Sequence, residues 1–171
     1  MRALVVYYSR TGVTKKACNA IADALRSLDP PVEVEVEEIV DLTDRSGALG
    51  YLRGGKEAML KRPTEIEPIE ADVGTFDLVV IGTPVWAWTC APAARTFSEQ
   101  SAEQISTAAF VATMGGSGDG GAFKALTQYC EVEPIATLTL LEKHVKAGDE
   151  EKYLRPVEAF ARELAVSAAG Q

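Results

Sequence analysis

The N-terminal part of the chain contains a strand, a hydroxyl-rich turn and a helix, in that order. Residues 4–8 form a short apolar run with β-branched and aromatic side chains, which indicates a buried strand. The apolar residues beyond the turn recur at intervals of about four and therefore share one helical face: Ala17, Ile21, Leu25 and Leu28. A strand, a turn and a helix in this order are the beginning of a βαβ unit, which is typical of an α/β fold.

The turn between this strand and helix has the composition of an anion site. The helix is expected to begin at Gly12–Val13, so its first N–H groups and the positive end of its dipole point back at the turn. Ser9, Thr11 and Thr14 add three hydroxyl groups, and Gly12 lets the backbone approach an oxygen closely. We interpret the turn as a phosphate cradle, with an ordinary turn and helix cap as the alternative. The pattern is neither a Walker A loop nor a dinucleotide-binding turn.

The rest of the chain continues the alternation of strands and helices. Residues 32–37 alternate Val and Glu, as in a strand with one solvated face at or near a sheet edge. Three further apolar runs predict buried strands at residues 76–82, 107–114 and 135–141. Helical patterns follow at residues 92–100, through Phe123, Leu126 and Tyr129, and in a last helix that Asp149 or a neighbour opens. We therefore expect a single domain over residues 1–171, with a doubly wound, five-stranded parallel sheet of order 2-1-3-4-5 and helices on both faces.

Three unusual loops follow the first, third and fourth strands of this predicted sheet. Strand order reverses between the first and third strands, and ligands of such sheets bind beyond the carboxyl ends of the strands at that point. The second loop holds both tryptophans of the chain, Trp86 and Trp88, and the third is the glycine-rich stretch 115–121. Together the loops predict a ligand with a phosphate at one end and a planar ring at the other. The alternative for the tryptophans is that they pack as a lid on the core.

These loops resemble those of the flavodoxin family, and the resemblance covers essentially the whole chain. Ser9-Arg10-Thr11-Gly12-Val13-Thr14 matches the family's [ST]-x-T-G-x-T loop, which holds the phosphate of FMN. Residues 82–88 resemble the second flavin loop, and residues 113–116 the start of the third.

The resemblance implies non-covalently bound FMN as the cofactor and electron transfer as the function, with no catalytic side chain. Trp86 or Trp88 would stack on the flavin ring, with Trp86 favoured by the loop alignment. The residues expected at the FMN site are Ser9, Arg10, Thr11, Gly12, Val13, Thr14, Thr83, Pro84, Val85, Trp86, Ala87, Trp88, Met114, Gly115, Gly116, Ser117 and Gly118.

Two departures from the family pattern bear on the kind of electron transfer. Many electron-carrier flavodoxins have a Gly beside the redox-active edge of the flavin, whereas this chain has Ala87, for which positive backbone angles are costly. The third loop often supplies an aromatic residue, and residues 115–121 contain none. One flavin face would then be open to a nicotinamide or a quinone. The partner is thus either a larger redox protein or such a small substrate, and the alternative function is an NAD(P)H-dependent FMN or quinone reductase.

Other motifs suggest further functions. Residues 116–121 match G-x-G-x-x-G, and Glu142 lies at a suitable distance for a ribose-binding acid, so an NAD(P)-binding protein is a less favoured alternative. Against it, that fingerprint belongs in the first βα turn. Cys90 and Arg95 are one residue too close for a phosphatase loop. A response-regulator receiver is excluded because Gly82 or Thr83 stands where its phosphorylated Asp is required.

Charge and composition exclude several classes of site. The net charge of −8 argues against nucleic acid and anionic membranes as partners. Cys18, Cys90 and Cys130 are far apart in sequence and are expected to be buried thiols, which favours a cytoplasmic location. His144 is the single histidine and is expected at the surface, so neither a His-based metal site nor a catalytic triad can form.

The segment 41–68 is the least regular part of the chain. It is expected to contain a short helix around residues 56–61, and it carries the basic residues Arg53, Lys56, Lys61 and Arg62. This basic cluster is a candidate site for an anionic second substrate, with a merely solvated face as the more common alternative. A homodimer is a further possibility that the sequence leaves open.

Overall fold

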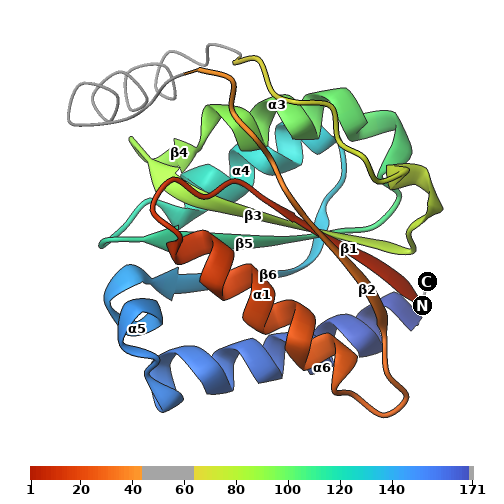
Figure 1. Ribbon diagram of the computed structural model, residues 1–171, viewed down its shortest axis with the longest axis vertical. Coiled ribbons are helices and arrows are strands. Elements are labelled where there is room, and N and C mark those ends of the chain that lie inside the picture. The colour runs from red at the N-terminus through yellow and green to blue at the C-terminus, as the bar shows by residue number, and fades with distance from the viewer. Residues whose placement is uncertain (44–63, 170–171) are drawn as a thin grey trace.

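A parallel sheet of order β2-β1-β3-β5-β6 forms the centre of the molecule (Figure 1). The computed structural model describes residues 1–43 and 64–169. The sheet consists of β1 (Arg2–Tyr7), β2 (Glu33–Glu38), β3 (Leu78–Trp86), β5 (Ala108–Met114) and β6 (Pro134–Leu141), and the two-residue β4 (Thr89–Cys90) pairs antiparallel with β3. Without β4, this is the predicted order 2-1-3-4-5, which is confirmed.

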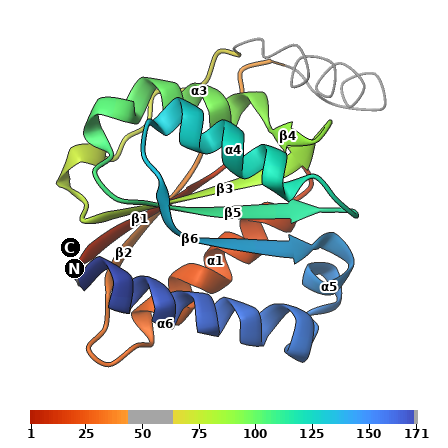
Figure 2. The same ribbon diagram turned by 180° about the vertical axis from the view of Figure 1, so that it is seen from behind.

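Helices cover both faces of the sheet, as Figures 1 and 2 show from opposite sides. One face carries α1 (Val13–Arg26) and α6 (Arg155–Ala169), and the other carries α3 (Pro92–Ser101) and α4 (Asp119–Cys130). The period of two in β1 explains this arrangement. Ala3, Val5 and Tyr7 pack toward α1 and α6. Leu4, Val6 and Tyr8 pack toward α3 and α4.

Gly82 in the middle of β3 allows α1 to lie close to the sheet. A Cβ at this position would overlap the Cys18 sulfur of α1 and the Cβ of Tyr7 in β1. The absence of a side chain at this one position thus sets how near the first helix comes to the strands that border its N-terminus.

The alternating strand β2 lies at the edge of the sheet, as predicted, and one of its glutamates holds a neighbouring segment. The Glu37 carboxylate accepts hydrogen bonds from the backbone N–H of Glu70 (2.6 Å) and Ala71 (3.0 Å). Beyond β2 the chain pairs with the same segment, because the N–H of Leu42 donates to the carbonyl of Glu65 at 2.9 Å. The predicted helix at 56–61 and the basic cluster of Arg53, Lys56, Lys61 and Arg62 lie outside the described residues.

The structure differs from the predicted elements in two places. The third strand was expected to end at Gly82, but β3 continues to Trp86, because its last residues pair with β4 and Pro84 is in register with Thr113 of β5. The last helical run does begin after Asp149, as expected, with a π-helical turn (Glu150–Leu154) that leads into α6, but the short helix α5 (Glu142–Ala147) before it was not predicted. Asp149 does cap that turn, since its carboxylate accepts from the N–H groups of Glu151 (3.1 Å) and Lys152 (2.9 Å).

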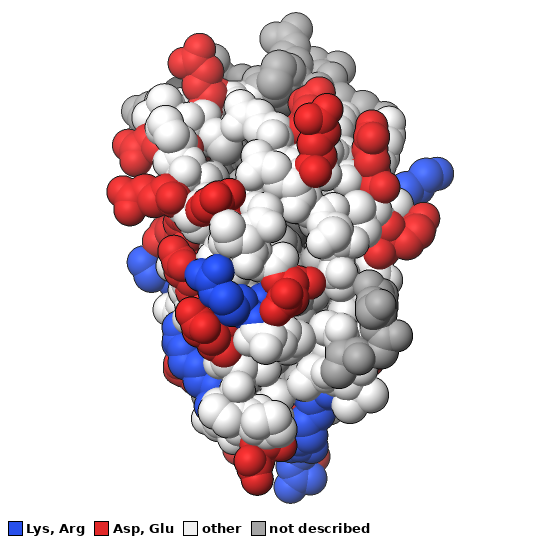
Figure 3. All heavy atoms as spheres, turned by 90° about the vertical axis from the view of Figure 1, so that its right-hand side faces the viewer, with Lys and Arg blue, Asp and Glu red and all other residues white. Residues whose placement is uncertain are grey.

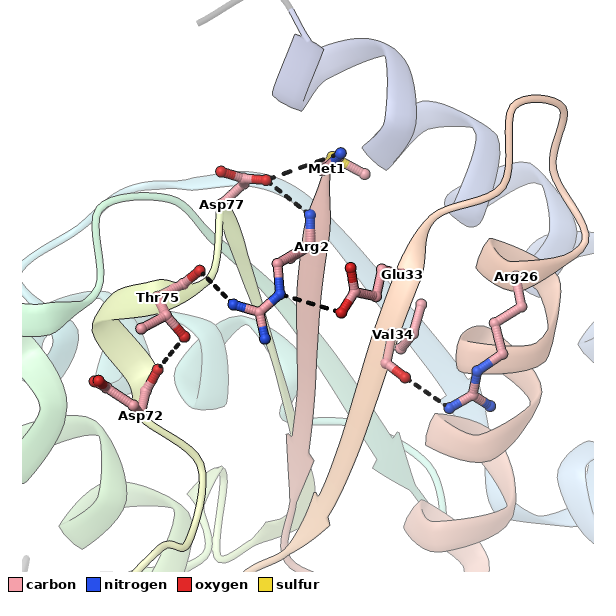
Figure 4. Close-up of polar contacts among 8 residues, drawn as sticks. All are labelled: Met1, Arg2, Arg26, Glu33, Val34, Asp72, Thr75 and Asp77. Carbon is pink, nitrogen blue, oxygen red and sulfur yellow. Dashed lines mark hydrogen bonds and ion pairs between the residues drawn. The ribbon is translucent and has the colours of Figure 1, made fainter.

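The amino ends of the strands form the pole of the molecule at which β1 begins. Acidic side chains are spread over much of this face, shown in Figure 3. Arg2 joins three segments here (Figure 4): its guanidinium donates to Glu33 of β2 at 3.3 Å and to the Thr75 carbonyl at 3.2 Å, and its backbone N–H donates to Asp77 at 2.7 Å. The predicted ligand loops lie at the opposite pole. Of the helices in the described part of the chain, none is both long and apolar enough for a membrane span.

Candidate functional site

A pocket of about 360 Å³ lies at the carboxyl ends of β1, β3, β5 and β6. All three predicted ligand loops contribute to it, and so does α5. The residues that line it are Arg10, Thr11, Val13, Thr14, Pro84, Val85, Trp86, Thr113, Gly115, Glu142 and Lys146.

The N-terminus of α1 provides backbone donors beside this pocket. Gly12 is the N-cap residue and has φ of 81°, in the left-handed region that favours glycine. The first intrahelical hydrogen bond runs from the N–H of Lys16 to the carbonyl of Gly12 (2.9 Å). The N–H groups of Val13, Thr14 and Lys15 therefore have no acceptor within the helix. No side chain caps this helix end. The arrangement is that of an anion-binding helix N-terminus.

A hydroxyl pair joins α1 to β5 in the wall of the pocket. The Oγ1 atoms of Thr14 and Thr113 are 2.8 Å apart, and both residues are buried. Whichever hydroxyl accepts this hydrogen bond keeps its own hydrogen for a third group. The Ser9 hydroxyl, in the loop between β1 and α1, is also buried, and it has no hydrogen-bond partner among the described residues. A buried oxygen without a partner is costly, so a ligand oxygen would satisfy it.

The two tryptophans have different surroundings. Trp86 is only 9% exposed and packs edge to face against Tyr8, with ring centroids 5.5 Å apart. It therefore packs on the core, as the alternative interpretation held, although it also lines the pocket. Trp88 is 72% exposed and lies in the turn of the β3–β4 hairpin. Of the two rings, that of Trp88 is the one presented to the outside.

Ala87 adopts a positive backbone angle although such angles are costly for a residue with a side chain. Ala87 has φ of 46° and Trp88 has φ of 60°. Val85 and Trp86 of β3 pair with Cys90 and Thr89 of β4, which leaves a hairpin turn of two residues. The twist of such hairpins favours positive φ at both turn residues, so pairing of the strands overrides the preference of the side chains.

The glycine-rich turn after β5 packs against this hairpin. Gly118 has φ of 111°, and a Cβ there would lie 2.9 Å from Val85 Cγ1 and 3.0 Å from the Trp88 Cα. A Cβ on Gly121 would overlap the Trp88 carbonyl oxygen. Two of the glycines that match the dinucleotide fingerprint are thus explained by close packing. In contrast, Gly115 and Gly116 face open space.

Other predicted site residues lie around the pocket but do not line it. Thr83 is buried, and its hydroxyl donates to the Pro84 carbonyl (2.9 Å) and accepts from the Ala91 N–H (3.0 Å). Met114 is buried at the end of β5, and Ser117 is exposed. The pocket thus brings together Arg10, Thr11, Val13, Thr14, Pro84, Val85, Trp86 and Gly115 of the predicted set.

Sequence reasoning missed the pocket residues Glu142 and Lys146. The ammonium of Lys146 donates to the Glu142 carboxylate at 2.8 Å, across one turn of α5. Glu142 had been considered only as a ribose-binding acid, and α5 had been overlooked. The available signal was a Glu and a Lys four residues apart directly after the last strand, because that strand ends at the same edge of the sheet.

The cysteines and the histidine do not provide a reactive group at the pocket. Cys18, Cys90 and Cys130 are buried, and burial raises the pKa of each thiol, that of Cys130 to about 11. Arg95 lowers the pKa of Cys90, but the effect of burial is larger. His144 is half-buried rather than on the surface, because it lies on α5 with Nδ1 3.1 Å from the Asp149 carboxylate.

A family model for flavodoxins matches residues 2–154. The chain belongs to the flavodoxin family. No curated protein sequence matches this flavodoxin-family chain.

Solved structures share the flavodoxin-like fold. A flavoprotein from Lactobacillus acidophilus NCFM, solved in complex with FMN, is 20% identical with a TM-score of 0.69, over 85% of this chain and 97% of that one. A flavodoxin from Streptococcus pneumoniae TIGR4 is 20% identical with a TM-score of 0.61, over 97% and 99% of the two chains. RosB, solved with bound 8-demethyl-8-formylriboflavin-5′-phosphate, is 13% identical with a TM-score of 0.67, over 99% of this chain and 79% of that one. At these identities the likeness establishes the fold.

Proposed function

We propose that this flavodoxin-family protein transfers electrons through FMN bound non-covalently in the pocket at the carboxyl ends of the strands. The family assignment supports FMN as the cofactor. One observation carries the proposal: the uncapped N-terminus of α1 and the Thr14–Thr113 hydroxyl pair meet in one pocket with the hairpin and the glycine-rich turn.

The residues present fit the phosphate of FMN. The backbone N–H groups at the start of α1 and the hydroxyls of Thr11 and Thr14 are donors without competing acid groups in their own loop. The Ser9 hydroxyl, which is buried and has no partner in the described part of the chain, is a further donor from the same loop. Oriented neutral donors of this kind bind anions, and Arg10 of the same loop also lines the pocket.

The protein has the tasks of holding and shielding the cofactor. Bound FMN supplies the redox chemistry, so no acid, base or nucleophile from the chain is required. Thr11 and Thr14 hold the phosphate end, and the hairpin of β3 and β4 presents the aromatic surface of Trp88 toward solvent.

A second candidate function is that of an NAD(P)H-dependent FMN or quinone reductase. The observation in its favour is the open surroundings of Gly115 and Gly116, in a loop that carries no aromatic side chain. Such a loop leaves room for a nicotinamide or quinone ring beside the cofactor.

The test is a visible spectrum of FMN-loaded, desalted protein, followed anaerobically during addition of NADPH. We expect the yellow absorbance to survive desalting. Rapid bleaching by NADPH would favour the reductase, and an unchanged spectrum would favour a carrier that needs a partner protein. Loss of all flavin despite excess FMN would overturn the proposal.

A variant pair tests the site itself. Thr11→Val removes a hydroxyl from the pocket, and we expect about tenfold weaker FMN binding, as for the loss of a hydrogen bond to a charged group. Thr137→Val makes the same change on an exposed face of β6 outside the pocket and should leave FMN binding unchanged. Equal affinities of the two variants would place the phosphate elsewhere.

A further inference from the structure

Helix α5 places an ion pair in the wall of the pocket at the carboxyl ends of the strands. Glu142 and Lys146 both line the pocket, together with Thr11, Thr14 and Thr113. The ammonium of Lys146 lies 2.8 Å from the carboxylate of Glu142, and the two side chains are 59% and 35% exposed. This pair follows the fifth parallel strand, whereas the predicted FMN loops follow the first, third and fourth.

The fold fixes where α5 presents this pair. The helix begins at the residue that follows β6, and it packs against α1. Its C-terminus is closed by Gly148, which has φ of 66°, with hydrogen bonds from the N–H of Gly148 to the Val145 carbonyl (3.2 Å) and from the N–H of Asp149 to the His144 carbonyl (3.0 Å). Lys146 is therefore held in the last turn of a helix whose two ends are both defined.

Glu142 and Lys146 have opposite electrostatic effects on a phosphate in the pocket. Glu142 brings a negative charge to a pocket that is also lined by hydroxyl residues and by Arg10, so it repels an anion. Lys146 attracts the anion, but its ammonium is already shared with Glu142. A phosphate dianion in the pocket carries more charge than one carboxylate and competes with it for the ammonium.

We propose that Lys146 is a phosphate-binding residue of the FMN site and that Glu142 competes with the phosphate for it. This inference rests on the proposed function. It assigns the ion pair of α5 a role in setting how tightly the cofactor is held and how strongly that affinity depends on salt.

The first test compares FMN with riboflavin, which lacks the phosphate. Lys146→Gln should weaken FMN binding about fivefold, the size of an exposed ion pair, and should leave riboflavin binding unchanged. Lys143→Gln is the matched control, because Lys143 is exposed on the same helix and does not line the pocket. Binding is measured by flavin fluorescence or calorimetry at low and high salt, and the deficit of Lys146→Gln should shrink as salt screens the charge.

The second test removes the competing carboxylate. Glu142→Gln should strengthen FMN binding by about threefold to fivefold, as expected for an exposed charge pair, without changing riboflavin binding. Addition of Lys146→Gln to this variant should abolish the gain.

The outcomes separate this inference from the proposed function. If the wild-type protein binds neither FMN nor riboflavin, the proposed function fails. If it binds FMN but Lys146→Gln and Lys143→Gln behave alike, the function stands and the role of Lys146 is overturned. Equal weakening of FMN and riboflavin by Lys146→Gln would also overturn it, because the residue would then support the pocket rather than the phosphate.

Discussion

At the scale of single residues, the hairpin turn after β3 concentrates unfavourable backbone conformations. Ala87 and Trp88 both have positive φ, which costs a non-glycine residue about 1–2 kcal/mol. Such strained conformations persist only where contacts with the surrounding structure fix the backbone dihedral angles. Here the β3–β4 pairing on one side and the packing of Gly118 and Gly121 on the other do so.

Ala87→Gly should therefore stabilise the protein. We expect a gain of about 1 kcal/mol in the free energy of unfolding, because glycine adopts positive φ without a steric penalty. The measurement is urea denaturation of the flavin-free protein. Ala125→Gly makes the same substitution inside α4 and should instead destabilise by about 1 kcal/mol, so a loss in both variants would contradict the strain at Ala87.

At the scale of secondary structure elements, the Thr14–Thr113 hydroxyl pair couples the first helix to the fourth parallel strand. Both hydroxyls are buried, so each satisfies the other in the absence of a ligand. The pair therefore has two functions that can be separated by mutation: to satisfy buried oxygens in the fold and to present a hydrogen to the pocket.

A double-mutant cycle separates these two functions. Thr14→Val or Thr113→Val alone should lower stability by about 1–3 kcal/mol, because one buried hydroxyl is left without its partner. The double variant should be less destabilised than the sum of the two, because both polar groups are gone. Its FMN affinity should nevertheless stay low. Recovery of FMN binding in the double variant would show that the pair acts only in the fold.

The elements also show what sequence patterns could and could not predict. The continuous apolar runs and the alternation of strands with helices are local patterns, and they predict a doubly wound sheet that is covered on both faces. The end of β3 is not predicted by such a pattern, because Trp86 belongs to a strand only through its pairing with Thr89. Helix α5 is too short for a periodic signal, so the pocket residues Glu142 and Lys146 were missed. The role of Gly121 depends on its contact with Trp88, which no local pattern contains.

At the scale of the whole molecule, buried tyrosines make stability depend on pH at the alkaline end. Burial, with the Glu38 charge as a lesser cause, raises the pKa of Tyr7 to about 12. Burial also raises the pKa of Tyr153. The folded protein thus holds these protons more tightly than the unfolded chain, whose tyrosines titrate near pH 10.

Stability should therefore fall as the pH rises above about 9, where the three buried thiols begin to contribute, and the buried tyrosines should add to this fall from about pH 10 to 12. The slope is up to about 1.4 kcal/mol per pH unit for one tyrosine. Urea denaturation at a series of pH values measures it, and Tyr7→Phe should make the decline shallower. The same decline in Tyr7→Phe as in the wild-type protein would contradict the assignment to Tyr7.

The chain on either side of residues 44–63 is tied together at its base. Asp41 and Ile66 form an antiparallel bridge, the hydroxyls of Thr43 and Thr64 are 2.8 Å apart, and the Thr64 hydroxyl also donates to the Asp41 carboxylate at 2.7 Å. These contacts hold residues 41–43 and 64–66 against each other within the described part of the chain. Because the entropy cost of joining two ends grows only with the logarithm of the length between them, about 0.6 kcal/mol per doubling, two ends that already contact each other favour an added segment. The contacts between residues 41–43 and 64–66 therefore make the position between them a suitable point for inserting a foreign peptide into the domain.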